Sequence, residues 1–542
     1  MAKRRSHRSQ SGLKATKAFD AARQRAQDVV LGHMLAVADE GGQQGGISAL
    51  ADGDGAAGEV NSVSRYWSPG LRDARGDQLP FLGLRRGQSR ELASTNAIAA
   101  GAIRTNIERG VGTGLALVSQ PNARVLGWSP QRVQEWKAHT QAEFSLWADS
   151  TACDWDDELN FYQKQALTLE AVLTSGDCFT LLPDAPRTRM QPYALRLQTL
   201  EADRVGNPLG QMDTPTVAGG VKLRSELGGI SAFYLYDSHP GGLLGSGKLH
   251  AGRWVERVGA SGRLRMLQHY QKRRPGQLRG MPYLSPVVEC IKQIGRWTEG
   301  EIMAAVLSAY FTVFIETPGA SAAPVFQGNQ AASGAPGQEI GLGKGAVVGL
   351  GPGEKPHFAN PGRPNPNFEP FFLAILKQIG MALGLPYELL LKQFNSSYSA
   401  SKAALLDAAV YFKNLRYWLA MSFCQPVYET WLAESVMLGR VDAPGFFADP
   451  LLRWAYTRAA WVGDSMGSIN PKDEVEAFVT AIDARLMTRE RAEWELFGSD
   501  WNESFEQKAA EQSRLRDAGM LPVPKAGAAA PAEDAPQEEV TP

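Results

Sequence analysis

Two strongly apolar helical segments enclose a polar stretch, and this arrangement constrains the fold more than any other feature of the sequence. The first segment, 371–383, is apolar at nearly every position, and the second runs over about 400–438 and is rich in Ala, Leu, Tyr and Trp. Gly384 and Pro386 end the first helix, because glycine suits a helix C-cap and proline cannot continue a helix. The polar stretch between the helices does not build a core. It suits a surface that touches a polymer without gripping it.

The composition describes a protein of several domains that is neither strongly basic nor strongly acidic. The chain has 542 residues, which is too long for one compact core. Its 56 Lys and Arg residues nearly balance its 57 Asp and Glu residues, so the formal net charge is -1. A general nucleic-acid coat carries a large basic excess, and the balance argues against that class. It leaves room for a brief or sliding contact with nucleic acid.

Cysteines, histidines and hydrophobic runs indicate no disulfide framework, metal site or membrane span. The four cysteines lie far apart and form no C-x-x-C pair, which predicts buried thiols in a reducing compartment. The seven histidines show no spacing that places two ring nitrogens on one helix face, and no cofactor is predicted. No apolar run reaches the roughly 18–20 residues that span a bilayer, so we expect a cytosolic protein without membrane contact.

The N-terminal half is expected to be a flexible arm followed by a mixed domain of helices and strands. Residues 1–60 combine a basic stretch with glycine-rich runs, a composition that suits a tether better than a core. In the mixed domain, 61–283, a helix is predicted to begin at Arg90 and end near Gly110. Acidic residues favour the N-terminus of a second helix at 156–173. The predicted strands are 178–182, 193–200, 231–236 and 253–258.

A long helix and a small loop-rich lobe are predicted in the middle of the chain. Ser285 is a suitable N-cap and Pro286 a suitable first residue for a helix over 284–309. The lobe, 310–368, is dominated by Gly, Ala, Pro and Ser between two strand-like runs. These runs are 311–316 and 345–350. A second apolar helix follows at 369–385.

Beyond the polar stretch, the sequence predicts a mostly helical C-terminal part. Asn470 and Pro471 suit the N-cap and first residue of one helix, which ends near Ile482. Thr488 suits the cap of the next helix. The end of the chain is rich in Ala, Pro and Glu and is predicted to be disordered. The predicted units of this part are 402–445, 446–520 and 521–542.

A serine in a glycine-rich segment offers an alternative function. Gly463-Asp-Ser-Met-Gly467 matches the G-x-S-x-G pattern, in which a strained turn presents a nucleophilic serine. That chemistry also needs a histidine later in the chain, whereas the last histidine here is His357. A glycine-rich loop before a capped helix explains the motif better. The main expectation is therefore a protein without catalysis, and a serine hydrolase that uses Ser465 is the alternative.

A basic cluster precedes the long helix. It consists of Lys272, Arg273, Arg274 and Arg279. A solvated loop accounts for such a cluster. Contact with an acidic partner or a passing nucleic acid is the sharper hypothesis, because cations of this kind neutralise phosphates. We keep the four residues as candidate DNA or partner contacts.

Several segments carry a recognisable pattern in a fixed order. They are Arg90-Glu-Leu-Ala-Ser-Thr-Asn-Ala-Ile-Ala-Ala-Gly-Ala-Ile with Val111-Gly-Thr-Gly-Leu, Arg279-Gly-Met-Pro-Tyr-Leu-Ser-Pro286, Leu383-Gly-Leu-Pro-Tyr-Glu-Leu-Leu with Asn395-Ser-Ser-Tyr-Ser-Ala-Ser, and Asn470-Pro-Lys-Asp-Glu-Val-Glu-Ala477. In this order and spacing they resemble the lambda-type portal protein family of tailed bacteriophages. The resemblance covers roughly residues 66–520.

The resemblance implies an α+β portal fold that assembles as a ring, usually a dodecamer, at one vertex of a capsid. The ring would be a channel for DNA packaging and ejection, with no enzymatic activity. Its parts would be a wing (61–283), stem helices (284–309 and 369–385), a clip (310–368), a tunnel loop (386–401), a wing helix (402–445) and a helical crown (446–520). The implied partners are further copies of the chain, the terminase large subunit, the major capsid protein, the head–tail connector or adaptor, and double-stranded DNA. The implied locations are the virion and, during assembly, the host cytoplasm.

The resemblance also gives the polar stretch a role. As a tunnel loop it would present polar side chains to DNA, namely Lys392, Gln393, Asn395, Ser396 and Ser397. A strongly basic channel would bind phosphates tightly and stall translocation, since every contact must be broken at each step. A nearly neutral loop with one lysine per subunit would make weak, renewable contacts. A DNA-binding scaffold that is not a portal is a third hypothesis.

Overall fold

The computed structural model describes residues 71–226, 228–242, 251–309, 313–316, 355–358, 366–394, 397–464, 471–497, 501–518 and 520. The chain divides into two units, Met1–Leu71 and Arg72–Pro542, and all described residues except Leu71 belong to the second. The predicted N-terminal arm, the predicted C-terminal tail and most of the predicted 310–368 lobe lie outside the described residues.

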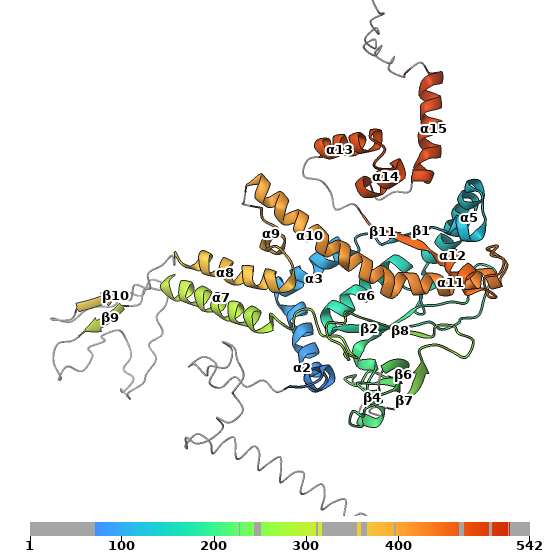
Figure 1. Cartoon of the computed structure of the whole chain (residues 1–542). Coiled ribbons are helices and arrows are strands. Elements are labelled where there is room, and N and C mark those ends of the chain that lie inside the picture. The colour runs from blue at the N-terminus through green and yellow to red at the C-terminus, as the bar shows by residue number, and fades with distance from the viewer. Residues whose placement is uncertain are drawn as a thin grey trace, which may run out of the picture. The chain divides into compact units, whose positions relative to one another are not determined.

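Four small sheets are seen among the described residues, and every strand pairing in them is antiparallel (Figure 1). One sheet has the order β3 (Gln198–Glu201), β2 (Asp177–Leu181), β8 (Met266–Tyr270), and another the order β4 (Val217–Ala218), β5 (Val221–Ser225), β6 (Gly228–Tyr236), β7 (Gly252–Glu256). Two further pairs join β1 (Ala116–Ser119) to β11 (Ala459–Val462) and β9 (Val313–Glu316) to β10 (Lys355–Phe358). The mixed α and β class is therefore confirmed. Of the strand predicted at 193–200, only the end is a strand, since β3 begins at Gln198.

Helices make up most of the remaining described chain. They are α2 (Ala74–Thr95), α3 (Ala97–Gly110), α4 (Ala123–Leu126), α5 (Pro130–Ala148), α6 (Phe161–Ser175), α7 (Val288–Ala309), α8 (Phe368–Leu383), α9 (Tyr387–Leu391), α10 (Tyr398–Leu419), α11 (Gln425–Met437), α12 (Pro450–Thr457), α13 (Pro471–Asp483), α14 (Arg489–Phe497) and α15 (Trp501–Asp517). The helix predicted over 400–438 consists of α10 and α11, joined by a π-helical turn at Ala420–Cys424. Pro426 has no N–H to donate, and the widened turn lies directly before it.

The helix predicted from Arg90 to Gly110 is in fact two helices that meet at Asn96. The backbone of Asn96 is extended, with φ -110° and ψ 123°, and its side chain accepts hydrogen bonds from the backbone N–H groups of Ile98 and Ala99. Asparagine is a strong N-cap because its side-chain oxygen satisfies amides that lack a helical partner. Asp73 caps α2 in the same way, through the N–H of Gly76.

The helix predicted from residue 156 begins later, at Phe161. Asn160 and Gln163 form a reciprocal capping box at its start. The acidic residues before it lie in a turn, where the buried carboxylate of Asp154 accepts the N–H of Leu159 at 3.1 Å and pairs with Lys164. The carboxylate therefore organises a loop, and the predicted role of these acidic residues at a helix N-terminus is wrong.

The predicted start of the long helix is also corrected. The helix α7 begins at Val288, and the Ser285 hydroxyl is buried without a hydrogen-bond partner among the described residues, so it does not act as the N-cap. At the end of α8, Gly384 adopts a left-handed conformation with φ 69°, which confirms the predicted C-cap. Trp297 of α7 stacks on Phe368 of α8 with ring centroids 4.7 Å apart, and the two helices contact each other.

Within the main core, an aromatic cluster joins α5 and α6 to the α10–α11 segment. Phe144 packs edge-on against Trp431 and Phe161, with ring centroids 5.1 and 5.4 Å apart. Phe161 stacks on Phe423 of the π-helical turn at 5.5 Å. These side chains are almost completely buried. The cysteines are free, with Cys153, Cys178 and Cys424 buried and Cys290 half-buried.

The two later helix starts follow their sequence signals. Pro471 is the first residue of α13, as predicted. The N–H of Arg491 donates to the Thr488 hydroxyl at 3.2 Å, which confirms the predicted cap of α14. None of the helices in the described ranges is long and apolar enough to cross a membrane.

Candidate functional site

The polar stretch 386–401 is not irregular throughout, because it contains the short helix α9. Glu388 and Leu389 of α9 are buried, and α9 contacts both α3 and α8. Burial of α9 thus holds this helix against α3 and α8, and the residues that follow it, 392–394, are exposed. Asn395 and Ser396 lie outside the described residues.

Lys392 follows α9 directly and carries the cation of this stretch. Its backbone is left-handed, with φ 52°, and its N–H donates to the Glu388 carbonyl. The side chain is 60% exposed, and its Nζ lies 3.1 Å from Oε2 of Glu108 on α3. Gln393 and Ser397 are also exposed, and the Ser397 hydroxyl accepts the N–H of Ala400 at the start of α10.

A buried hydrogen-bond network lies beneath this stretch and joins four segments. The Tyr283 hydroxyl donates to the Leu383 carbonyl at the end of α8, at 2.6 Å. Asn106 of α3 donates to the same hydroxyl at 3.2 Å and accepts from the Tyr411 hydroxyl of α10 at 2.8 Å. Burial raises the pKa of Tyr283 and Tyr411, so both hydroxyls keep their protons and donate. Sequence reasoning missed Asn106 and Tyr411, since no motif marks them.

Arg279 belongs to the interior and not to a surface cluster, which corrects its grouping with the other cations. Its guanidinium is 2% exposed and pairs with the fully buried carboxylate of Asp177, and it also donates to the carbonyls of Val205, Gly219 and Ala202. Burial raises the pKa of Asp177, but the charges of Arg279 and Arg86 outweigh burial and hold the pKa below its ordinary value. A partner one hundred positions away in sequence gave no signal that could have placed Arg279 inside.

The other three cations of the cluster are exposed. Arg274 pairs with Asp77 and donates to the Arg72 carbonyl, so its charge is engaged within the chain. Lys272 and Arg273 are exposed on the same loop. The contact prediction therefore narrows to Lys272, Arg273 and Arg274, for which it stays a prediction.

Glycines allow the turn before α7 to cross the junction of α6 and β2 closely. A Cβ added to Gly280 would lie 1.9 Å from the Gly176 carbonyl oxygen, and one added to Gly176 would lie 2.5 Å from the Gly280 carbonyl oxygen. Gly176 also has φ 89°, a conformation that side chains disfavour. The Arg-Gly-Met-Pro-Tyr segment thus fixes the base of α7 in three ways, through a buried ion pair, a glycine crossing and the Tyr283 hydroxyl.

The end of α3 is tied to the segment that holds the G-x-S-x-G motif. Asp464 accepts hydrogen bonds from the N–H and hydroxyl of Thr113, at 2.8 and 2.7 Å. A Cβ at Gly112, where φ is 60°, would lie 2.3 Å from the Asp464 carboxylate. Arg416 of α10 donates to the Gly110 carbonyl at the end of α3. Ser465 itself lies outside the described residues, so the structure leaves the serine prediction untested.

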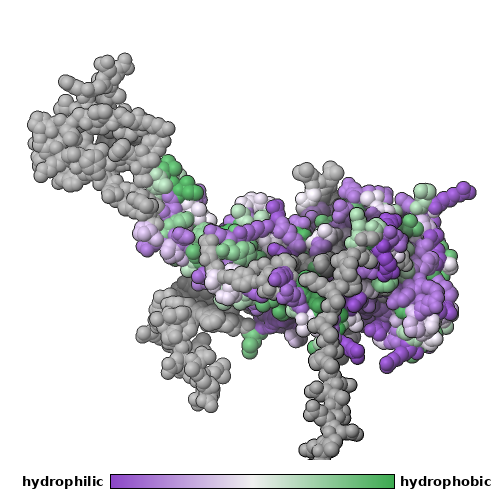
Figure 2. All heavy atoms as spheres, turned by 90° about the horizontal axis from the view of Figure 1, so that it is seen from above, coloured by the Kyte–Doolittle hydropathy of each residue, from purple (hydrophilic) through white to green (hydrophobic). Residues whose placement is uncertain are grey.

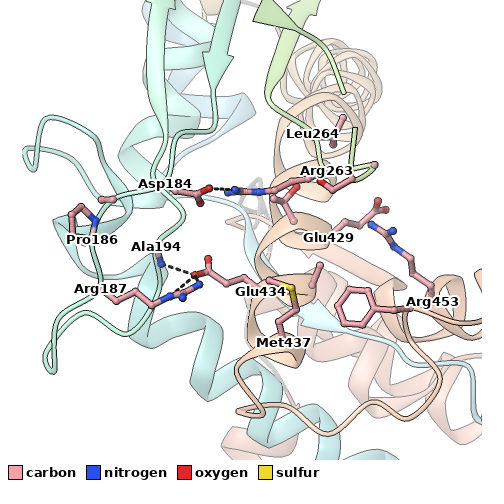
Figure 3. A pocket seen from close by; sticks show the side chains of 16 residues that line it. Asp184, Pro186, Arg187, Ala194, Arg263, Leu264, Glu429, Glu434, Met437 and Arg453 are labelled. Carbon is pink, nitrogen blue, oxygen red and sulfur yellow. Dashed lines mark hydrogen bonds and ion pairs between the residues drawn. The ribbon is translucent and has the colours of Figure 1, made fainter. Parts of the chain in front are cut away.

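A hollow of about 680 Å³ lies between α11, the 184–187 loop and the 261–264 turn (Figure 3). Most of the charged side chains that line this hollow form ion pairs with each other. Arg263 pairs with Asp184, and Arg187 pairs with the buried carboxylate of Glu434, which also accepts the N–H of Ala194. These contacts hold two loops against α11, and they explain the charges without a ligand.

One cluster has the side chains of a metal site, but arginines of the chain already engage its Asp203 carboxylate. The ligand atoms of Glu201, Asp203 and His239 lie within 4.8 Å of one another. The Gly241 N–H donates to Nδ1 of His239, so the neutral ring carries its proton on Nε2, which lies 2.9 Å from Glu201. Asp203 also pairs with Arg86 and Arg90.

Comparison with known proteins identifies the chain. Residues 61–416, more than half of the chain, match the family described as phage portal protein, lambda family. The chain is therefore a phage portal protein. Within that class it belongs to the lambda family.

Two relatives extend this match over most of the chain. The portal protein of Escherichia phage N15 is 25% identical over 504 residues, which cover 88% of this chain and 92% of that protein. Portal protein B of Escherichia phage lambda is 23% identical over 504 residues, with 88% and 91% covered.

Solved structures give a more distant likeness. A chain from the neck of an empty GTA particle, computed with C6 symmetry, aligns over 80% of this chain and 96% of its own length, with 13% identity and a TM-score of 0.44. A chain from the neck of a native GTA particle, computed with C12 symmetry, aligns over 75% and 92%, with 12% identity and a TM-score of 0.40. Scores of this size carry no conclusion of their own.

Proposed function

We propose that copies of this portal protein close into a dodecameric ring at one capsid vertex, and that double-stranded DNA passes through the ring during packaging and ejection. In this proposal 61–283 and 402–445 form the wing, 284–309 and 369–385 the stem, 310–368 the clip, 386–401 the tunnel loop and 446–520 the crown. The clip docks the terminase large subunit and later the head–tail connector. The wing meets the major capsid protein.

The observation that carries the proposal is a set of large apolar side chains left exposed on α7 and α10. Ile302, Met303 and Val306 of α7 line an open hollow of about 570 Å³ together with Ile98 of α3. On α10 and the π-helical turn that follows it, the exposed apolar side chains Leu406, Val410, Tyr417 and Met421 are spaced by four, seven and four positions. Green apolar surface interrupts the purple polar surface on the face seen in Figure 2.

A group of large apolar side chains exposed on one helix indicates contact with another protein surface. A closed ring of identical subunits supplies one, because each copy presents two different faces to its two neighbours. Burying an exposed isoleucine or leucine contributes roughly 1.5–3 kcal/mol each. Burying several such side chains at each interface would make the ring more stable than the separate subunits.

The tunnel-loop assignment is supported by the balance of charges in 386–401. Glu388 and Lys392 are its two ionisable acidic and basic residues, and Glu388 is buried. Lys392, Gln393 and Ser397 are exposed, so a passing duplex meets one cation and several neutral polar groups per subunit. Such a surface binds phosphates weakly, as a conduit requires.

The test is ring formation by an α7 variant and its matched control. Ile302→Asp places a charge in the exposed apolar face, whereas Gln293→Asp places the same charge at an exposed polar position of the same helix. We expect annular particles of the wild type and Gln293→Asp in negative-stain images, and a loss of rings for Ile302→Asp with the monomer still folded. Rings formed equally by all three would contradict this interface.

The proposal assigns no catalysis to Ser465. No histidine follows it in the sequence, and the family to which the chain belongs is one of portal proteins. Ser465→Ala is expected to package DNA normally. Loss of a measurable ester-hydrolysing activity in this variant would favour the hydrolase instead.

A further inference from the structure

We propose that Glu108 is a positioning residue that neutralises the tunnel-loop lysine and competes with DNA phosphates for it. This inference rests on the proposed function, because it assumes that 386–401 faces DNA. It adds that the affinity of the loop for DNA is set by a carboxylate on another element, α3.

The geometry brings one cation and one anion together from segments far apart in sequence. Nζ of Lys392 lies 3.1 Å from Oε2 of Glu108, and the two side chains are 60% and 50% exposed. The pair forms because α9 docks on α3 through its buried residues, which places position 392 beside the last turn of α3. Both groups remain open to solvent, so a phosphate can reach the lysine.

The backbone at Lys392 is a second, independent observation. Its φ of 52° is left-handed, which glycine or asparagine adopts at less cost than lysine. Asp157, Leu209 and Arg485 are the other non-glycine residues with positive φ among those described. The left-handed residue ends α9 as its C-cap, so the backbone fixes the point at which the Lys392 side chain leaves the helix.

Glu108 stands where a helix disfavours it. The last turn of α3 has the negative end of the helix dipole, and a carboxylate there is less stable than one in the first turn. Arg416 caps the same end with a favourable charge. The position of Glu108 is therefore not explained by helix stability, whereas its contact with Lys392 gives it a role.

The strength of the pair suits exchange. An exposed ion pair is weak, since solvent and salt screen it. A phosphate that enters contact distance therefore replaces Glu108 at little cost, and Glu108 takes the lysine back when the phosphate moves on. The carboxylate lowers the affinity of the loop for DNA without abolishing the contact.

The test compares Glu108→Gln with Glu91→Gln in assembled full-length rings. Glu91 forms a similar exposed pair with Lys292, at 3.7 Å and with side chains 57% and 49% exposed, away from the tunnel loop. Both variants remove one negative charge per subunit. The probe is linear double-stranded DNA, and binding is measured over a range of salt concentrations.

We expect Glu108→Gln to bind DNA about two- to five-fold more tightly near 0.1 M salt, the factor that matches the usual worth of an exposed ion pair. The slope of log affinity against log salt should steepen, since more phosphates are neutralised. In a packaging reaction the same variant should translocate DNA more slowly. Glu91→Gln should match the wild type in both measurements.

The double variant Glu108→Gln/Lys392→Ala decides whether the effect acts through the lysine. We expect it to match Lys392→Ala alone. An equal gain in affinity for Glu108→Gln and Glu91→Gln, or a gain that persists without Lys392, overturns the inference. The tunnel-loop assignment, on which this inference rests, fails separately if Lys392→Ala rings package DNA at the normal rate.

Discussion

Two ion pairs of this portal protein consist of similar groups but have different roles. At the base of α7, Arg279 and Asp177 are buried and held by further hydrogen bonds, and they bind segments that must not separate. At the polar loop, Lys392 and Glu108 are exposed and hold each other through one contact. The difference teaches that burial decides the role of an ion pair, since removing a buried partner is costly whereas an exposed pair exchanges freely.

The largest expected effect comes from breaking the buried contact. Asp177→Ala leaves Arg279 buried without a carboxylate and leaves Arg86 with Asp203 as its remaining carboxylate, and we expect a loss of about 3–5 kcal/mol in the free energy of unfolding. Asp442→Ala is the control, because Asp442 is 75% exposed and lies 3.5 Å from Arg132. Denaturant unfolding of both variants measures the difference. Equal stability of the two would erase the distinction between buried and exposed pairs.

The same contact predicts a dependence of stability on pH. The pKa of Asp177 in the folded protein lies below its ordinary value of 3.8. Its contribution is therefore complete above that value and is lost as the pH falls through the folded pKa. Acid unfolding of the wild type should thus include this loss, and Asp177→Asn should show a smaller change in stability over the same acidic range.

The glycine crossing should rank next. Gly280→Ala puts a Cβ where the Gly176 carbonyl stands, and we expect a loss of about 2–4 kcal/mol, comparable to overpacking with a backbone shift. Gly87→Ala in α2 is the control, since a Cβ there meets nothing within 4 Å. The control should leave stability unchanged or raise it by up to about 1 kcal/mol. A tolerated Gly280→Ala would show that the base of α7 is not tightly packed.

A smaller and more local effect is expected at the network beneath the loop. Tyr283→Phe removes the donor to the buried Leu383 carbonyl, which should cost about 1–3 kcal/mol. Tyr270→Phe removes a similar bond to the Gln277 carbonyl elsewhere. Hydrogen exchange separates them, because only Tyr283→Phe should speed exchange in α8 and α9. Equal exchange in α9 for both variants would uncouple the network from the loop.

The sequence predicted the features that depend on neighbouring residues. The C-cap at Gly384, the helix start at Pro471, the cap at Thr488 and the strand at 178–182 follow from local chemistry, and the structure has them. The helix break at Asn96 was also locally encoded, but the apolar residues around it concealed the capping signal. The short helix α9 was missed because five residues are too few to show a periodic pattern.

Features that depend on distant partners were beyond local reasoning. In the sequence, Arg279 resembled a surface cation, but in the structure it is buried and pairs with Asp177 of β2. Glu108 carried no signal, since its partner Lys392 follows a different helix nearly three hundred positions away. The family resemblance supplied the function, and the five loop residues assigned to DNA remain a prediction.

The most direct test of the account is a cryo-electron microscopy reconstruction of the purified full-length protein under assembly conditions. The account predicts a closed ring, with α7 of each copy buried against a neighbour and 386–401 lining the central opening. A folded monomer without annular particles, or a ring in which 386–401 lies on the outer surface, would contradict it.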